Sequence, residues 1–140
     1  MKNFILIARG VAKLGNGKRN AKDYPYWDEL VQLLKEKGYQ TIELTGELPL
    51  NDLNKIINES GTVICVDSFV QHYAWYLGKK AIVLWGPSDP LIFGHPENIN
   101  LLKDRKYLRP DQWVKWDNVK HEMEAFCPPE DILKEIEKMV

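Results

Sequence analysis

Two apolar runs of the chain end abruptly in residues that form hydrogen bonds well. The first run, residues 63–66, is followed by Asp67 and Ser68, and the second, residues 81–85, is followed by Gly-Pro-Ser-Asp-Pro at 86–90. Ligands of open parallel sheets bind at the carboxyl ends of the strands. We therefore expect both polar groups to line one site.

Asp67, Ser68 and His72 indicate a site for an anion, with a phosphate as the obvious ligand. Ser68 is placed to cap the helix that follows, and the free N–H groups of a first helical turn can hold a phosphate. A carboxylate repels a phosphate, so Asp67 is expected to bind a sugar hydroxyl or backbone donors of the turn. His72 lies one helical turn after Ser68, where its imidazole can donate to a phosphate oxygen. The alternative, and the more frequent role of a single histidine, is a structural one.

Glycines and basic residues gather in the segment 10–22, which is predicted to be a long loop. Its cations include Lys18, Arg19 and Lys22. The stretch GNGKRN at 15–20 lacks the spacing of a P-loop. The segment is expected to supply mobile backbone and positive charge to the phosphate site, and the alternative is a solvated surface loop.

The helix expected at 70–77 has two distinct faces. At about 100° per residue, its core stripe consists of Val70, Tyr73, Ala74 and Leu77. Phe69, His72 and Tyr76 fall on the opposite side, with Trp75 near them. An aromatic face opposite a complete core stripe needs a partner, which is a ligand, a second subunit or another domain, and self-association is one expectation. The alternative is that Phe69 and Tyr76 pack under the Trp-rich segment 103–127, since burial is the usual fate of aromatic side chains.

Short apolar runs alternate with amphipathic segments along the chain. Strands are predicted at 4–7, 41–44, 62–66 and 80–85, with a short fifth strand at 99–102. Helices are predicted from Pro25 to Gly38, at 50–60, at 70–77 and after Pro128-Pro129. This alternation predicts an α/β fold, a Rossmann-like parallel sheet with helices on both faces. Residues 1–140 are expected to form a single domain, with no structure assigned to 103–127.

The composition excludes several classes of function. The chain has 140 residues, 44% of them hydrophobic and 28% charged, and its formal net charge is −1. Nothing in the overall charge therefore points to nucleic acid or to an anionic membrane. Cys65 and Cys127 form neither a disulfide framework nor a metal tetrad, which suits a reducing cytoplasm. The apolar run near the start is too short for a signal peptide or a membrane span.

The segment 67–90 resembles the signature of the family 9 glycosyltransferases, the ADP-heptose:lipopolysaccharide heptosyltransferases. That family carries Asp-[Ser/Thr]-x-x-x-His, then a helix ending in Leu-Gly, then a strand followed by Gly-[Pro/Gly]-[Ser/Thr]-x-Pro. The matching residues here are Asp67, Ser68, His72, Leu77, Gly78, Gly86, Pro87, Ser88 and Pro90. Further similarity is found at 22–27, at the turn 45–47 and at 127–130.

The resemblance implies one half of a GT-B fold, in which two Rossmann-like domains face each other across a cleft. The similar half is the C-terminal one, which binds the nucleotide sugar, so the expected ligand is an ADP-sugar. The donor-binding residues carried over are Lys22, Glu47, Asp67, Ser68, Phe69, His72, Gly86, Pro87 and Ser88. The family is metal-independent, so neither a metal nor another cofactor is expected.

The resemblance also implies a role for individual residues. Asp67 and Ser68 would contact the donor diphosphate and sugar, His72 would lie beside the phosphates, and Lys22 would offset their charge. Glu47 would approach the nucleoside ribose or base. Phe69 stands where better-known members commonly carry glycine, so its side chain either points away or narrows the phosphate site.

Three hypotheses follow, because the half of the family that binds the acceptor has no counterpart here. Met1-Lys2 and a finished-looking last helix nevertheless predict a complete polypeptide. The first hypothesis is a minimal glycosyltransferase, or its donor-binding component, with an acceptor site from a partner chain or a homodimer. The second is a non-catalytic module that binds a nucleotide sugar or a nucleotide. The third is a Rossmann-like domain whose motif is vestigial.

Overall fold

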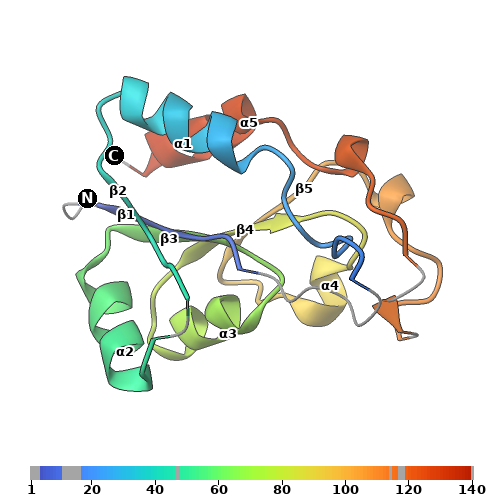
Figure 1. Cartoon of the computed structure of the whole chain (residues 1–140), viewed down its shortest axis with the longest axis horizontal. Helices are drawn as coiled ribbons and strands as arrows, with labels where there is room; N and C mark the ends of the chain where they lie inside the picture. The colour runs from blue at the N-terminus through green and yellow to red at the C-terminus, as the bar shows by residue number, and fades with distance from the viewer. Residues whose placement is uncertain (1–3, 11–16, 47, 114, 117–118, 140) are drawn as a thin grey trace.

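The computed structural model describes residues 4–10, 17–46, 48–113, 115–116 and 119–139 (Figure 1). Its strands are β1 (Ile5–Ala8), β2 (Thr41–Glu43), β3 (Thr62–Val66), β4 (Ala81–Trp85) and β5 (Ile99–Leu102). Its α-helices are α1 (Trp27–Glu36), α2 (Leu50–Glu59), α3 (Phe69–Tyr76), α4 (Pro90–Phe93) and α5 (Pro129–Lys138). Short 3₁₀ helices are η1 (Arg105–Tyr107) and η3 (Met123–Ala125).

The described strands form a parallel sheet in the order β2-β1-β3-β4-β5. β1 lies between β2 and β3, with Ile7 opposite Glu43 and Ile64, and Cys65 of β3 lies opposite Val83 of β4. Because all strands run in one direction, their carboxyl ends share one edge of the sheet. The predicted parallel sheet and its short fifth strand are confirmed.

Helices cover both faces of this sheet (Figure 1). α1 and α5 pack on one face, over strand residues such as Ile5, Ile64 and Ile82. α2 and α3 pack on the other face, over residues such as Leu6 and Val63. Alternate residues of a strand point to opposite faces, so a strand covered on both sides is apolar at every position. This explains the continuous apolar runs in the sequence.

Two helix starts differ from the prediction. α1 begins at Trp27 and not at Pro25, because Tyr26, with φ −113° and ψ 30°, is still outside the helix as its N-cap residue. α3 begins one residue early, at Phe69, because the chain turns into the helix directly after Ser68. Neither shift changes which side of the helix faces the core.

α4 lies in a segment for which no helix is predicted from the sequence. The carboxylate of Asp89 accepts a hydrogen bond from the backbone N–H of Leu91 at 2.9 Å, and Pro90 occupies the first helical turn. Both are usual features of a helix start. A helix this short shows no apolar periodicity, so the capping residues are its sequence signal.

The segment between β5 and α5 lies at the carboxyl ends of the strands, on the right of Figure 1. It is mostly irregular, apart from η1 and η3. The backbone N–H of Arg109 donates to the carbonyl of Pro87 at 3.0 Å, and Lys103 Nζ donates to the carbonyl of Glu124 at 2.9 Å. The part of the chain to which no structure was assigned thus borders the predicted site.

Candidate functional site

Lys22, from the loop that follows β1, reaches Asp67 at the carboxyl end of β3. Lys22 Nζ lies 2.9 Å from Asp67 Oδ2, and the two side chains are only 21% and 10% exposed. The other carboxylate oxygen accepts a hydrogen bond from Gln71 Nε2 at 2.9 Å. A buried charge needs a partner, so Asp67 holds the Lys22 ammonium beside the start of α3. Among the described residues, this carboxylate is paired with the side chains of Lys22 and Gln71 and not with backbone N–H groups of the turn.

Ser68 is the N-cap residue of α3, but its side chain does not cap the helix as predicted. Its Oγ instead donates back to the carbonyl of Val66 at 3.2 Å. Within the described chain, no side-chain hydrogen bond closes this first turn. The N–H groups at the start of a helix lack intrahelical partners. Those of α3 therefore remain available to an anion.

Trp116 forms a wall of this site. Lys22 Nζ lies 4.7 Å from the centroid of the indole ring, and Arg109 Cζ lies 3.5 Å from it. Arg109 is buried, at 9% exposure, and its Nη1 donates to the carbonyl of Lys115 at 3.2 Å. Trp116 is thus in cation–π contact with both cations.

His72 is exposed on α3 and pairs with a second histidine. Its Nδ1 lies 2.8 Å from Nε2 of His95. The indole of Trp75 stacks on His95, with ring centroids 4.2 Å apart and planes 8° apart, and its Nε1 donates to Glu97 at 3.3 Å. Burial lowers the pKa of His95, the charge of His72 lowers it further, and Glu97 opposes both effects. Nδ1 of His72 is therefore within hydrogen-bond distance of His95, and the lowered pKa of His95 favours its neutral imidazole.

The aromatic residues on the outer side of α3 are exposed. Phe69 is 59% exposed and Tyr76 is 75% exposed, so the expectation that they pack under the Trp-rich segment is wrong. Both rings stack on Tyr73, with centroid distances of 5.5 Å and 6.2 Å. The ring of Phe69 therefore lies along the flank of α3 and not across the helix start.

The core side of α3 follows the predicted stripe. Ala74 is fully buried, and the other stripe residues Val70, Tyr73 and Leu77 pack against the same cluster. Gln71 is also fully buried, although it is polar. Its amide nitrogen donates to Asp67, whereas its Oε1 has no hydrogen-bond partner among the described residues.

The loop after β4 is buried beneath other segments of the chain. A Cβ atom on Gly86 would overlap the ring of Phe126, so packing explains this glycine. Ser88 is 1% exposed, and the carbonyl of Pro87 accepts hydrogen bonds from Arg109 N and Gln112 Nε2. Contact between these loop residues and a donor stays a prediction. Their contacts within the chain fix the loop.

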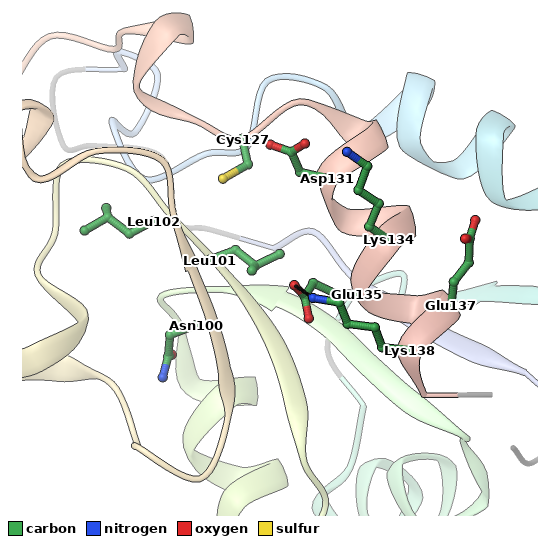
Figure 2. A pocket seen from close by; sticks show the side chains of 9 residues that line it. All are labelled: Asn100, Leu101, Leu102, Cys127, Asp131, Lys134, Glu135, Glu137 and Lys138. Atoms are coloured by element: carbon green, nitrogen blue, oxygen red, sulfur yellow. Dashed lines mark hydrogen bonds and ion pairs between the residues drawn. The ribbon is translucent and has the colours of Figure 1, made fainter.

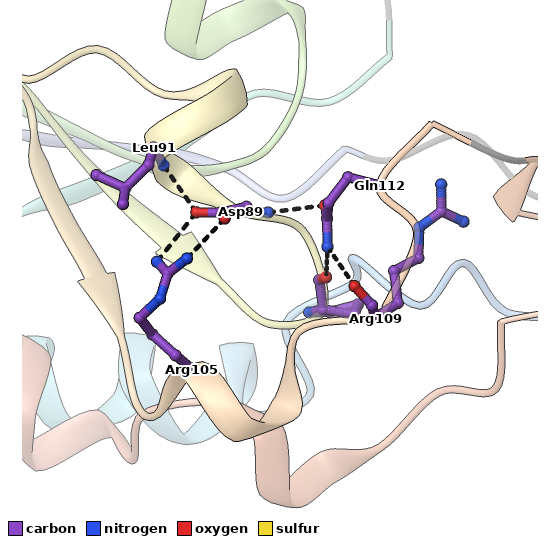
Figure 3. Close-up of polar contacts among 6 residues, drawn as sticks. Asp89, Leu91, Arg105, Arg109 and Gln112 are labelled. Carbon is purple, nitrogen blue, oxygen red and sulfur yellow. Dashed lines mark hydrogen bonds and ion pairs between the residues drawn. The ribbon is translucent and has the colours of Figure 1, made fainter.

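Asp89 anchors this loop to the segment that follows β5 (Figure 3). Arg105 donates to both carboxylate oxygens, at 3.2 Å and 2.8 Å, and the backbone N–H of Asp89 donates to Gln112 Oε1 at 3.0 Å. The hydrogen bond from Arg105 holds the pKa of Asp89 below its ordinary value, although burial opposes this. Bidentate Arg–carboxylate pairs fix geometry well, so the Asp89–Arg105 pair ties the two segments together.

Glu47, the residue expected near the nucleoside, lies outside the described residues, as do residues 11–16 of the glycine-rich loop. The neighbouring Gly46 has φ 69°. Glycine adopts this left-handed conformation without strain. The turn is therefore present, and the role of Glu47 stays a prediction.

One cavity, of about 610 Å³, lies between β5 and α5 (Figure 2). Its charged walls come from α5 and include three acidic and two basic side chains: Asp131, Lys134, Glu135, Glu137 and Lys138. The residues predicted from the sequence to bind a donor do not line it. We therefore place the candidate site at Lys22, Asp67 and the start of α3 and not in this cavity.

Gln71, His95 and Trp116 belong to the site but were not predicted from the sequence. Gln71 follows Asp67 by four residues, a spacing that brings side chains together on a helix, and this was an available signal. His95 and Trp116 lie far along the chain from their partners. Only the tertiary structure brings them to the site.

Among the described residues, no group of three or more His, Cys, Asp or Glu side chains is arranged to hold a metal ion. The thiol of Cys65 is fully buried, and burial raises its pKa. It therefore stays protonated and is no nucleophile. In the same part of the chain, no helix combines the length and apolar character needed to cross a membrane.

Sequence comparison relates part of the chain to one enzyme family. Residues 40–106 match glycosyltransferase family 9 (heptosyltransferase). Over 87 residues, 61% of this chain, the sequence is 32% identical to lipooligosaccharide heptosyltransferase 2 of Haemophilus influenzae, of which the match covers 25%.

Structure comparison extends the similarity to nearly the whole chain. The E. coli heptosyltransferase WaaC with ADP superposes with a TM-score of 0.69 at 16% identity, over 99% of this chain and 45% of that one. E. coli ADP-heptose lipopolysaccharide heptosyltransferase II gives 0.67 at 19% identity, over 99% and 46%. At these identities the likeness concerns the fold, and the chain spans less than half the length of each relative. Part of the chain is thus similar to the family 9 glycosyltransferases, and the chain has the α/β fold of one part of a heptosyltransferase.

Proposed function

We propose that the chain binds a nucleotide sugar, of the ADP-sugar type, with its diphosphate at the start of α3. The observation that carries this proposal is the position of the Lys22 ammonium, held by Asp67 beside a helix start that has no side-chain cap. Free N–H groups and the helix dipole favour an anion there, and Lys22 adds a full positive charge. The domain would correspond to the C-terminal, donor-binding half of a heptosyltransferase.

His72 would bind the same diphosphate through its second ring nitrogen. Because His95 favours the neutral form, its Nε2 can accept a hydrogen bond from Nδ1–H of His72. In the other tautomer, Nε2–H of His95 donates to Nδ1 of His72, and Nε2–H of His72 would then donate to a phosphate oxygen. Asp67, whose charge opposes that of a phosphate, would act by positioning Lys22 and would also be the residue that binds a sugar hydroxyl.

Glycosyl transfer is the reaction that this donor site would serve. Lys22, His72 and the N–H groups of α3 would stabilise the diphosphate as it leaves the sugar, which is electrostatic catalysis by preorganised donors. An acceptor site would come from another chain or a second subunit. The exposed Phe69 and Tyr76 of α3, which both stack on the half-buried Tyr73, form a surface suited to such a contact.

A non-catalytic binding module is the second candidate. Lys22 and the start of α3 would hold a nucleotide sugar in such a module in the same way as in a transferase. The two candidates differ in whether the protein turns over a nucleotide sugar. The transferase releases ADP from ADP-heptose in the presence of an acceptor preparation, and the binding module does not.

A screen of thermal stability against nucleotides and nucleotide sugars tests both candidates. A ligand that binds only the folded state raises the melting temperature. Both candidates predict a higher melting temperature with ADP or an ADP-sugar. A melting temperature unchanged by every nucleotide at millimolar concentration would contradict both.

A further inference from the structure

A second cavity, of about 470 Å³, lies between the loop after β4 and the segment that contains η1 and η3. Pro87 forms one side, and residues 106–110 and 119–125 contribute the other sides. None of Lys22, Asp67, Ser68 or His72 is among its lining residues, whereas Pro87, which the resemblance carries over as a donor-binding residue, is one of them. The cavity is therefore distinct from the site proposed for the diphosphate.

Positive charge dominates the lining. Lys106, Arg109 and Lys120 line the cavity together with one acidic residue, Glu122. The ion pairs of the described residues involve neither Lys106 nor Lys120. A concave site lined by one sign of charge raises the local concentration of the opposite ion. The cavity is thus suited to an anionic group.

The remaining walls are apolar or aromatic. Leu108, Pro110, Val119 and Ala125 line the cavity, and Tyr107 contributes its ring beneath Lys106, whose Nζ lies 5.1 Å from the ring centroid. A volume of this size falls in the range of small-molecule sites. It exceeds the needs of a bare inorganic ion, so the occupant would have an organic body as well as a charge.

Arg109 connects this cavity to the candidate donor site. It lines the cavity, and its guanidinium lies against the ring of Trp116, which Lys22 contacts as well. Lys22 Nζ and Arg109 Cζ lie 4.7 Å and 3.5 Å from the centroid of the same ring, so the two positive charges are close to each other. Because neither Lys22 nor the start of α3 lines the cavity, an occupant there would lie beside a diphosphate at Lys22 and would not replace it.

We propose that this cavity binds a sugar-sized organic anion, carrying a phosphate or a carboxylate, at the same time as the donor site is filled. Binding of such an anion in this cavity does not depend on the proposed function. If that function holds, the cavity is a site for the second substrate of the transfer, and the chain supplies part of the acceptor site itself.

The test titrates the full chain with glucose 6-phosphate and with glucuronate, using uncharged glucose as the reference, and follows backbone amides by NMR. We expect at least one of the two anions to shift the amides of residues 106–109 and 119–125, and to bind about tenfold more tightly than glucose because its hydrogen bonds are charge-assisted. The double variant Lys106→Ala/Lys120→Ala should lose about tenfold in affinity for that anion. Lys134→Ala, which removes a lysine of the other cavity, should bind it as the unmodified chain does.

Lys22→Ala separates this proposal from the proposed function, because it should weaken ADP binding and leave sugar-anion binding intact. If neither anion shifts the amides of residues 106–109 and 119–125, the proposal is wrong. Equal affinity in the Lys106→Ala/Lys120→Ala variant, with an unchanged melting temperature, would overturn it as well. Displacement of a bound anion by ADP would contradict simultaneous occupancy.

Discussion

The ammonium of Lys22 lies 2.9 Å from Oδ2 of Asp67, and both side chains are largely buried at the carboxyl end of β3. The pair joins the loop after β1 to the start of α3. In the unliganded chain the lysine charge is balanced by a carboxylate. A diphosphate would therefore have to share this lysine with Asp67.

Lys22→Ala should weaken ADP binding about tenfold or more, because a hydrogen bond to a charged group contributes about 1.5–3 kcal/mol. Lys22→Arg keeps the charge and serves as the matched control, with a smaller loss. Isothermal titration calorimetry measures both affinities. Equal ADP affinity in Lys22→Ala and the unmodified chain would show that the lysine serves the fold alone.

The His72–His95 pair should make stability depend on pH. The pKa of His95 in the folded chain is lowered by burial and by His72, so below about pH 6.5, the ordinary value for histidine, the unfolded chain binds more protons than the folded one. The free energy of unfolding contributed by His95 is then fully present above pH 6.5 and falls as the pH decreases through that value. His95→Phe keeps a ring against Trp75 and removes the titration.

Urea unfolding between about pH 7.5 and 5.5 checks this expectation. The slope of the free energy of unfolding against pH should be smaller in His95→Phe than in the unmodified chain. Glu97 is the acidic residue that opposes the shift, so Glu97→Gln should steepen the slope. Identical slopes in the unmodified chain and His95→Phe would refute the role given to His95.

Much of the fold can be predicted from the sequence, because each buried strand is a continuous apolar run bounded by polar residues. The residues 62–66 and 81–85 end where the structure ends β3 and β4. The neighbourhood of Asp67 and Ser68 could be predicted as well, since the carboxyl ends of parallel strands meet at one edge. Side-chain partners could not, as the misassigned cap at Ser68 shows.

The segment 103–127 is where the sequence was least informative. Its order depends on single long-range contacts such as Asp89 with Arg105 and Trp116 with Arg109, and these leave no periodic pattern. A helix or strand repeats its burial every few residues, whereas an irregular segment does not. The contribution of Trp116 to the site could therefore not be anticipated.

Gly86→Ala should destabilise the fold by about 1–3 kcal/mol, the usual cost of overpacking a core, because the new Cβ would overlap the ring of Phe126. Gly10→Ala is the control, since no atom of the described residues lies within 4 Å of a Cβ placed there. Thermal unfolding monitored by circular dichroism compares the two. Equal melting temperatures for both variants would refute the packing explanation of Gly86.

Asp89→Ala should cost about 1–3 kcal/mol of stability, because α4 loses its cap and Arg105 loses its buried partner. Asp89→Asn keeps the capping oxygen and should cost less. Since the pKa of Asp89 is lowered, its contribution should be lost as the pH falls through the folded-state value. Urea unfolding measures these free energies, and an Asp89→Asn variant less stable than Asp89→Ala would contradict the capping role.

The exposed aromatic side of α3 should support self-association. Light scattering over a range of concentrations should show a mass above 16.3 kDa that decreases in the variant Phe69→Ser/Tyr76→Ser. Large exposed apolar patches commonly mark interaction sites. A monomer at every concentration would contradict this prediction and leave the donor site unaffected.

Calorimetric titration of ADP-heptose into the unmodified chain and into Lys22→Ala tests the central claim most directly. We predict saturable binding with one site per chain, and an affinity about tenfold or more weaker in Lys22→Ala, measured at a temperature at which both proteins are folded. Absence of binding to the unmodified chain at millimolar ADP-heptose, or equal affinity in the two proteins, would contradict a diphosphate site formed by Lys22 and the start of α3.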